Sequence, residues 1–171
     1  MATLAARAIG IDVEQDFADY FTARAVPLRR LAYALCGDWY LAEDLVQNTF
    51  VKVYRHWRRI RAETLDAYTR RTLINTFLSD KRGRRREQIL PDVPERAIRA
   101  SDPTQAIDLR RGLATLSPRQ RAMVVLRYLE DLSVAEVAAT LGVAEGTVKS
   151  QTARGLQALR QSLDSTIVNE E

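Results

Sequence analysis

Residues 133–150 read SVAEVAATLGVAEGTVKS, and this stretch decides the fold of the C-terminal part of the chain. Within it, Ala138, Gly142 and Val148 stand at the spacing of a helix-turn-helix. The first helix needs a small residue where the second helix crosses it, the turn needs a glycine for its left-handed backbone, and Val148 packs against both helices. A three- or four-helix bundle that contains this pattern by chance is the alternative.

Helix-start signals flank the motif and favour the first interpretation. Ser133 with Glu136 predicts a capping box, and Ser117-Pro118 with Gln120 predicts a second one. The last helix is expected from about residue 145 to 163. The N-terminal half of such a helix enters the major groove of DNA. Elimination of the apolar positions leaves these side chains exposed there: Glu145, Thr147, Lys149, Ser150, Gln151 and Arg154.

The first half of the chain has the apolar spacing of three further helices. One runs through residues 17–35 with Pro27 as a possible kink or break, and one follows Asp38 as its cap and runs to about residue 57. A third is expected from Leu65 to about Lys81, ended by a glycine and by repulsion between like charges. The prediction is an all-α fold of two small helical modules joined by a flexible linker.

The boundaries of these parts follow from composition and periodicity. Residues 1–16 form an N-terminal extension, 17–87 the first module, 88–105 the linker, 106–163 the second module and 164–171 a tail. The linker contains three prolines and has no convincing helical period, and it is longer than most connections within a domain.

The composition limits the chemistry available to this protein. Its 171 residues include one Cys and one His, which excludes an intramolecular disulfide, a multi-cysteine metal site and most histidine-based catalysis. No apolar run approaches the length of a membrane span, and no secretory signal is present at the N-terminus. We therefore expect a cytoplasmic protein that is not an enzyme, has no cofactor or metal, and does not associate with membranes.

The net charge of +4 is concentrated in one part of the sequence. Residues 55–87 contain eleven basic and four acidic residues, a local charge of +7, while residues 106–171 are neutral overall. A surface this basic points to a polyanionic partner. Single strands are held by basic grooves and by groups that stack on or hydrogen-bond to unpaired bases, so an exposed Asn75 amide fits such a partner.

Several motifs, in order along residues 17–163, resemble the sigma-70 family of bacterial RNA polymerase sigma factors. AEDLVQNTFVKVY at 42–54 resembles the family's core-binding helix, and NTFLSDKR at 75–82 resembles the segment that follows it. LSPRQR at 116–121, LSVAEVA at 132–138 and GTVKS at 146–150 resemble its C-terminal domain. With little sequence outside the two modules, the chain looks like a compact member of the extracytoplasmic-function group.

The resemblance implies the partners and the residues that contact them. The partners are core RNA polymerase, through its β′ clamp and β flap, and promoter DNA, with an anti-sigma factor as a further candidate. Polymerase contacts fall on Asp44, Gln47 and Asn48. Contacts to the melted minus-10 strand fall on Arg70, Arg71, Asn75, Ser79, Lys81, Arg82, Arg84 and Arg85. Contacts to the minus-35 duplex fall on Thr147, Lys149, Ser150, Ala153 and Arg154.

Two other classes of protein remain as alternatives. A LuxR-type or response-regulator helix-turn-helix protein reads similarly over residues 116–160, but residues 1–100 lack the alternating strands and acidic pocket of a receiver domain. An enzyme would need Asp44 with Glu43, or His56, for its chemistry. His56 has no pairing group placed by the sequence, and Cys36 is expected to be a buried small apolar residue.

Overall fold

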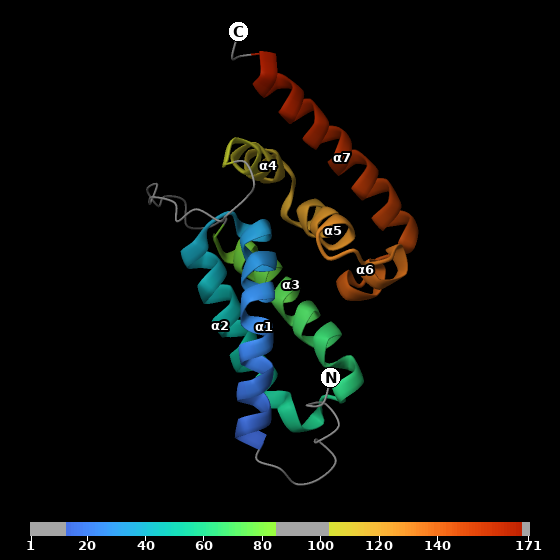
Figure 1. Cartoon of the computed structure of the whole chain (residues 1–171). Coiled ribbons are helices and arrows are strands. Elements are labelled where there is room, and N and C mark those ends of the chain that lie inside the picture. The colour runs from blue at the N-terminus through green and yellow to red at the C-terminus, as the bar shows by residue number, and fades with distance from the viewer. Residues whose placement is uncertain (1–12, 85–102, 169–171) are drawn as a thin grey trace.

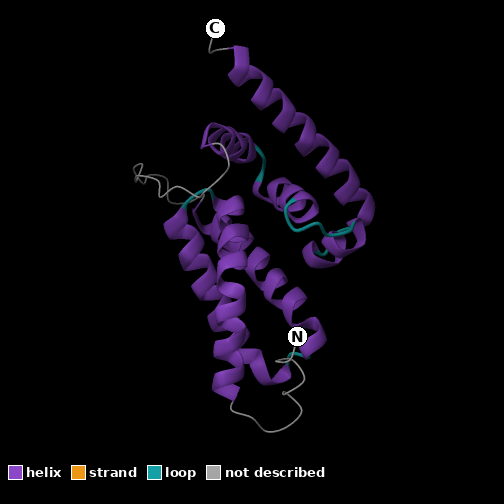
Figure 2. Ribbon diagram, in the orientation of Figure 1, coloured by secondary structure: helices purple, strands orange, loops and turns teal. Residues whose placement is uncertain are grey.

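The computed structural model describes residues 13–84 and 103–168, with side chains over 13–80 and 108–164. These residues are helical with short connections and contain no strand (Figure 2), as the all-α prediction required. The predictions for Arg85, for most of the linker and for both chain ends lie outside the described residues.

The N-terminal module consists of three long helices. These are α1 (Val13–Cys36), α2 (Trp39–His56) and α3 (Leu65–Arg84), with the short 3-10 helices η2 (Trp57–Arg59) and η3 (Ala62–Thr64) between the last two. Asp38 caps α2 as predicted, because its carboxylate accepts a hydrogen bond of 2.8 Å from the backbone N–H of Leu41. The three helices lie side by side in the lower part of Figure 1.

Four helices make up the C-terminal module. They are α4 (Pro103–Thr115), α5 (Pro118–Tyr128), α6 (Val134–Leu141) and α7 (Glu145–Val168). The long helix α7 packs against each of the other three (Figure 1). The tight crossing of α5 and α7 depends on Gly155, since a Cβ atom there would lie 2.7 Å from Cγ2 of Val124.

The two modules pack against each other through a shared core. Helix α5 contacts α1 and α3, and α6 contacts α3 (Figure 1). A single buried cluster takes side chains from both modules. Among them are Leu31, Leu35 and Ile74 from the first module and Met123, Leu126 and Val137 from the second. The sequence predicted two modules, and this packing between them is a property that only the structure reveals.

Three helix boundaries differ from the sequence-based expectation. Helix α1 begins at Val13 and continues through Pro27. Proline has no N–H, so one backbone carbonyl of the preceding turn loses its hydrogen bond within the helix. Because Pro27 lies on the exposed side of α1, water can bond that carbonyl. Helix α3 passes Lys81 and Gly83 and ends at Arg84, because a glycine costs a helix only about 1 kcal/mol and does not stop it. Helix α7 extends to Val168.

Candidate nucleic-acid interface

The helix-turn-helix has the local geometry that its sequence predicts. The Ser133 hydroxyl accepts the backbone N–H of Glu136 and the Glu136 carboxylate accepts the N–H of Ser133, so the capping box is complete. The backbone N–H of Ser133, which donates to the Glu136 carboxylate, is the largest cause that lowers the pKa of that carboxyl group, and the Ser133 side chain lowers it further. Gly142 has a φ of 64° in the turn, and Val148 is 0% exposed between the helices. The motif is therefore a folded helix-turn-helix.

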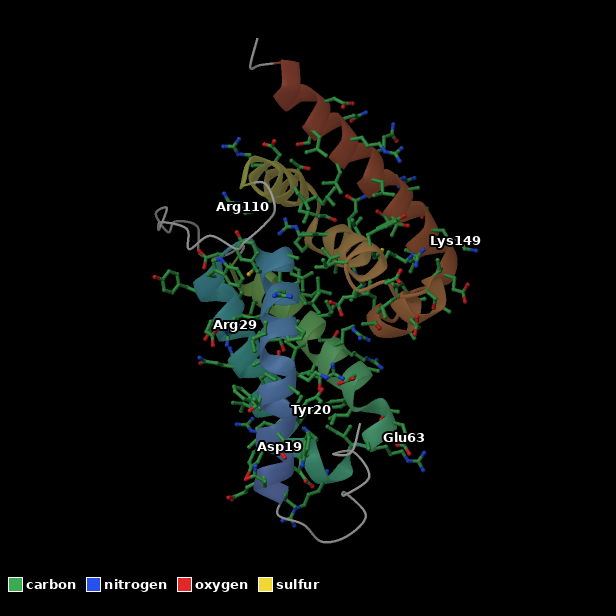
Figure 3. The ribbon with its side chains drawn as sticks, in the orientation of Figure 1. Asp19, Tyr20, Arg29, Glu63, Arg110 and Lys149 are labelled. Atoms are coloured by element: carbon green, nitrogen blue, oxygen red, sulfur yellow. The ribbon has the colours of Figure 1, made fainter. Side chains whose placement is uncertain are left out.

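The expected groove-facing side chains of α7 are open to solvent. Thr147, Lys149, Ser150, Ala153 and Arg154 are all exposed. Figure 3 shows Lys149 near the start of α7, on the side turned away from the N-terminal helices. The first three turns of α7 thus present hydroxyl and cationic groups outward, which suits contacts to phosphates and base edges.

Gln151 was expected among these exposed side chains, and that expectation is wrong. It is half-buried because the Gln120 side-chain amide donates to its side-chain oxygen at 3.2 Å and to its backbone carbonyl at 3.4 Å. The predicted capping box at Ser117 is consequently incomplete. Ser117 accepts the N–H of Gln120, but the Gln120 side chain is engaged with α7. The pair fixes the position of α7 on α5.

One face of α3 presents a polar stripe. Arg71, Asn75 and Ser79 follow one another at four-residue spacing, and all three are exposed. The Ser79 hydroxyl donates to the backbone carbonyl of Asn75 at 2.8 Å, a bond that does not use the side-chain amide of Asn75. Lys81, Arg82 and Arg84 belong to the last turns of α3. Arg71, Asn75 and Ser79 therefore share one exposed face of α3, and Lys81, Arg82 and Arg84 follow at the C-terminal end of the helix.

Arg70 is the exception among the predicted strand-binding residues. Its Nε lies 3.3 Å from Oε2 of Glu130, at the end of α5, and the two side chains are only 24% and 25% exposed. The guanidinium thus faces the C-terminal module and not the polar stripe of α3. Sequence reasoning had no signal for this contact, because its partners are sixty residues apart.

The predicted polymerase-binding residues share the outer face of α2. Asp44, Gln47 and Asn48 are exposed, and the Asn48 amide donates weakly to the Asp44 carboxylate at 3.4 Å. Their neighbour Glu43 is half-buried and pairs with Arg29 of α1 at 2.7 Å. The face is accordingly a polar surface on a helix that α1 and α3 hold in place.

Arg121 is a structural residue that the sequence analysis did not single out. It is 8% exposed, and its guanidinium donates to the carbonyls of Leu113, Ala114 and Leu116 at 2.7–3.2 Å. It also donates at 2.7 Å to the carbonyl of Leu35, at the end of α1 in the other module. Burial lowers its pKa, although a guanidinium stays charged at physiological pH. The sequence did offer one indication that Arg121 is buried, because it directly precedes the apolar run 122–126.

The described residues offer no sign of a metal centre or a membrane anchor. Over residues 13–84 and 103–168, no group of three His, Cys, Asp or Glu side chains could hold a metal ion. Within the same ranges no helix is long and apolar enough to cross a membrane. His56 is exposed at the end of α2, and Cys36 is half-buried where full burial was expected.

The fold and these surfaces define a class first: an all-α DNA-binding protein with a basic helix in one module and a helix-turn-helix in the other. Comparison with known proteins then gives the family. Residues 21–87 match Sigma-70 region 2 and residues 106–159 match Sigma-70, region 4. The chain is 39% identical to the RNA polymerase sigma-E factor of Streptomyces avermitilis, over 88% of this chain and 86% of that protein.

A second relative and a solved structure agree. The ECF RNA polymerase sigma factor SigE of Mycolicibacterium smegmatis is 41% identical over 78% of this chain and 56% of its own length. The sigma factor RpoE of Bartonella quintana, solved in complex with the anti-sigma factor NepR, superposes with a TM-score of 0.75 at 30% identity, covering 88% of this chain and 98% of that one.

The chain belongs to the sigma-70 family of RNA polymerase sigma factors, in its extracytoplasmic-function group. It is a protein that binds core RNA polymerase and directs it to promoters. The family is not one of catalytic enzymes. A response-regulator-type transcription factor does not fit a chain whose first half is sigma-70 region 2.

Proposed function

We propose that the exposed faces of this sigma factor divide promoter recognition between the two modules. The start of α7 reads the minus-35 duplex, the polar stripe of α3 holds the melted minus-10 strand, and the outer face of α2 binds the β′ clamp of core polymerase. The observation that carries the proposal is the common exposure of Arg71, Asn75 and Ser79 on one side of α3, within the most basic segment of the chain.

The minus-35 assignment is argued from position on α7. Lys149, Ser150 and Arg154 lie in the N-terminal half of the helix, where a recognition helix meets base edges, and Thr147 and Ala153 line the same surface. Arg154→Ala should weaken promoter-dependent initiation by about 1–3 kcal/mol equivalent if the guanidinium contacts a base. Arg160→Ala is the matched control, since Arg160 is exposed on the same helix beyond the groove-facing half.

The assay is initiation by reconstituted holoenzyme on promoters that it selects from fragmented genomic DNA. Loss of minus-35 dependence in Arg154→Ala alone supports the assignment. An unchanged promoter profile for Arg154→Ala, or an equal loss in Arg160→Ala, contradicts it.

The minus-10 assignment is argued from charge and from the exposed position of Asn75. Opened strands are gripped through phosphates and read through unpaired base edges, and Arg71 and Asn75 supply one group of each kind. Lys81, Arg82, Arg84 and Arg85 extend the positive charge. Arg71→Ala should weaken binding of holoenzyme to a promoter with a pre-opened minus-10 region, whereas Arg30→Ala, which removes an exposed arginine from α1, should not.

The polymerase contact is argued from the polar face of α2. Asp44, Gln47 and Asn48 form an exposed acid and amide surface. Asp44→Arg reverses its charge and should abolish co-elution with core polymerase, while reversal of the exposed Glu63 on η3 should leave co-elution intact. Co-elution of Asp44→Arg at the wild-type level would remove α2 from the interface.

We propose further that the chain acts in the cytoplasm, as a specificity subunit without catalysis of its own. Opening duplex DNA costs roughly 1.4 kcal/mol per base-pair step, so the polymerase must contribute binding energy to promoter opening. The sigma factor also contacts the polymerase through its β flap. An anti-sigma factor is proposed as a regulator because RpoE, solved with NepR, shares this fold at 30% identity. Co-purification of the tagged chain from its host tests this, and recovery with polymerase subunits alone contradicts it.

A further inference from the structure

A lysine of α2 reaches across to α3 and is held there. The two helices pack side by side (Figure 1), and the Lys52 ammonium donates to the hydroxyl oxygen of Thr76 at 2.9 Å. The Thr76 hydroxyl in turn donates to the backbone carbonyl of Thr72 at 2.8 Å. Thr76 is only 4% exposed, whereas Lys52 is exposed. The exposed side chain of Lys52 therefore spans the junction of the helices, and its ammonium is fixed on α3.

The place where Lys52 is held borders the polar stripe of α3. Residues three or four apart are neighbours on a helix surface, with Cβ atoms about 5–6 Å apart, so Thr76 lies beside Ser79. Asn75 directly precedes Thr76 in the sequence. A strand that follows Arg71, Asn75 and Ser79 along α3 would pass beside the Lys52 ammonium.

The charge of Lys52 is available to such a strand. Among the side chains that the structure describes, no carboxylate lies within ion-pair distance of its ammonium, whereas Arg24 and Arg70 are both paired with acids. An ammonium has three N–H donors, and the bond to Thr76 uses one of them. The remaining donors and the positive charge can therefore serve a phosphate oxygen.

We propose that Lys52 binds a backbone phosphate of the opened minus-10 strand, so that the strand-binding surface extends from α3 onto α2. The inference rests on the proposed function of α3. Because Thr76 already fixes the ammonium, less side-chain freedom is lost on binding than for an unattached lysine. A phosphate contact carries no sequence information, so Lys52 positions the strand and does not read its bases.

The test is equilibrium binding of reconstituted holoenzyme to a labelled promoter with a pre-opened minus-10 region, followed by fluorescence anisotropy. Lys52→Met keeps most of the stem, removes the charge and should weaken binding about two- to fivefold, the range of exposed ion pairs. The slope of log affinity against log salt should fall by about 0.7, the contribution of one phosphate contact on a single strand. Between about 50 and about 200 mM salt, the advantage of the wild type should therefore shrink about 2.6-fold.

Two variants control for charge and for folding. Arg30→Met is the matched control, because it removes one exposed charge from α1, and it should leave affinity and salt slope unchanged. Lys52→Arg keeps the charge and should retain binding. The inference is overturned if Lys52→Met behaves like Arg30→Met, or if Lys52→Arg loses as much as Lys52→Met. Lys52→Met should also co-elute with core polymerase at the wild-type level, and loss of co-elution would place Lys52 in the polymerase contact instead.

A double-variant comparison tests the role of Thr76. Thr76→Val removes the oxygen that accepts from Lys52 and should weaken strand binding, but only while Lys52 is present. An equal loss from Thr76→Val in the Lys52→Met background would overturn the anchoring of Lys52 by Thr76.

The proposed function can fail separately from this inference. If Arg71→Ala leaves binding to the pre-opened promoter unchanged, then α3 is not the strand-binding surface and the proposed function is wrong. If Arg71→Ala weakens binding while Lys52→Met behaves like Arg30→Met, the strand-binding surface of α3 stands and the role of Lys52 is wrong.

Discussion

Replacing Gly155 by alanine places a methyl group in the crossing of α5 and α7. The new Cβ would lie 2.7 Å from Cγ2 of Val124 and 3.3 Å from Cγ of Gln120. Carbon atoms prefer separations of about 3.5–4.0 Å, so one of the helices must move by roughly 1 Å. Val124 cannot rotate away easily, because a β-branched side chain in a helix has one strongly preferred rotamer.

The expected cost follows from this clash. Overpacking of a well-packed core costs typically about 1–3 kcal/mol, and we expect Gly155→Ala to lower the free energy of unfolding by that amount. Gly146→Ala is the matched control on the same helix, because no atom beyond the neighbouring residues and backbone of its own helix lies within 4 Å of its added Cβ. Alanine has the higher helix propensity, so that control should be neutral or stabilise by up to about 1 kcal/mol.

Urea unfolding followed by circular dichroism measures both variants. The combined variant Val124→Ala with Gly155→Ala should be less destabilised than the sum of its parts, by about 1 kcal/mol, since the clashing methyl is gone. If Gly155→Ala is as stable as Gly146→Ala, or if the combined variant shows no coupling, the close crossing of α5 and α7 is wrong.

Three further predictions concern buried or capping groups. Arg121→Met should lower the free energy of unfolding by about 3–5 kcal/mol, since bonds from charged donors are worth about 1.5–3 kcal/mol each but are not additive; a loss near zero in urea unfolding contradicts the buried geometry. Ser133→Ala removes the capping hydroxyl and should cost about 0.5–2 kcal/mol in the same assay; no loss would mean that the cap is dispensable. Burial, with a smaller contribution from nearby Asp66, raises the pKa of Tyr20 to about 12. The folded chain then keeps a phenol proton that the unfolded chain releases near pH 10, so stability should be complete below about pH 10 and fall toward pH 12. Tyr20→Phe should flatten that fall in melts over this range, and an unchanged slope contradicts it.

A sequence pattern predicts a contact well when the two residues that make the contact are close together in the sequence. The capping box at Ser133 was confirmed because both of its bonds join residues three apart. The same pattern at Ser117 predicted a box that is only half formed. Its Gln120 side chain found a partner thirty-one residues away on α7, and a local pattern carries no information about that competitor.

The residues of the candidate site also divide into those that local patterns predict correctly and those that only the packing of the modules places. The exposure of Arg71 and Asn75 follows from helical periodicity, which places them opposite the apolar positions of α3. Arg70 is the next residue in the sequence, but a step of one residue turns it toward the other module, where it meets Glu130. Charge alone put it with the other arginines, and only the packing of the modules separates it from them.

The sequence by itself determined the all-α class, the helix-turn-helix and the family, because helix periodicity, caps and turn glycines are interactions among neighbours. Only the tertiary structure decided that the two modules share a core, that Arg121 bonds the end of α1 across the interface, and that Arg70 faces Glu130. The Arg70–Glu130 and Arg121–Leu35 contacts join residues 60 and 86 positions apart. Two sequences can have the same helix periods, caps and turns and still differ in these long-range contacts. Whether the two modules pack together is therefore decided by burial and pairing between distant residues, which local patterns do not encode.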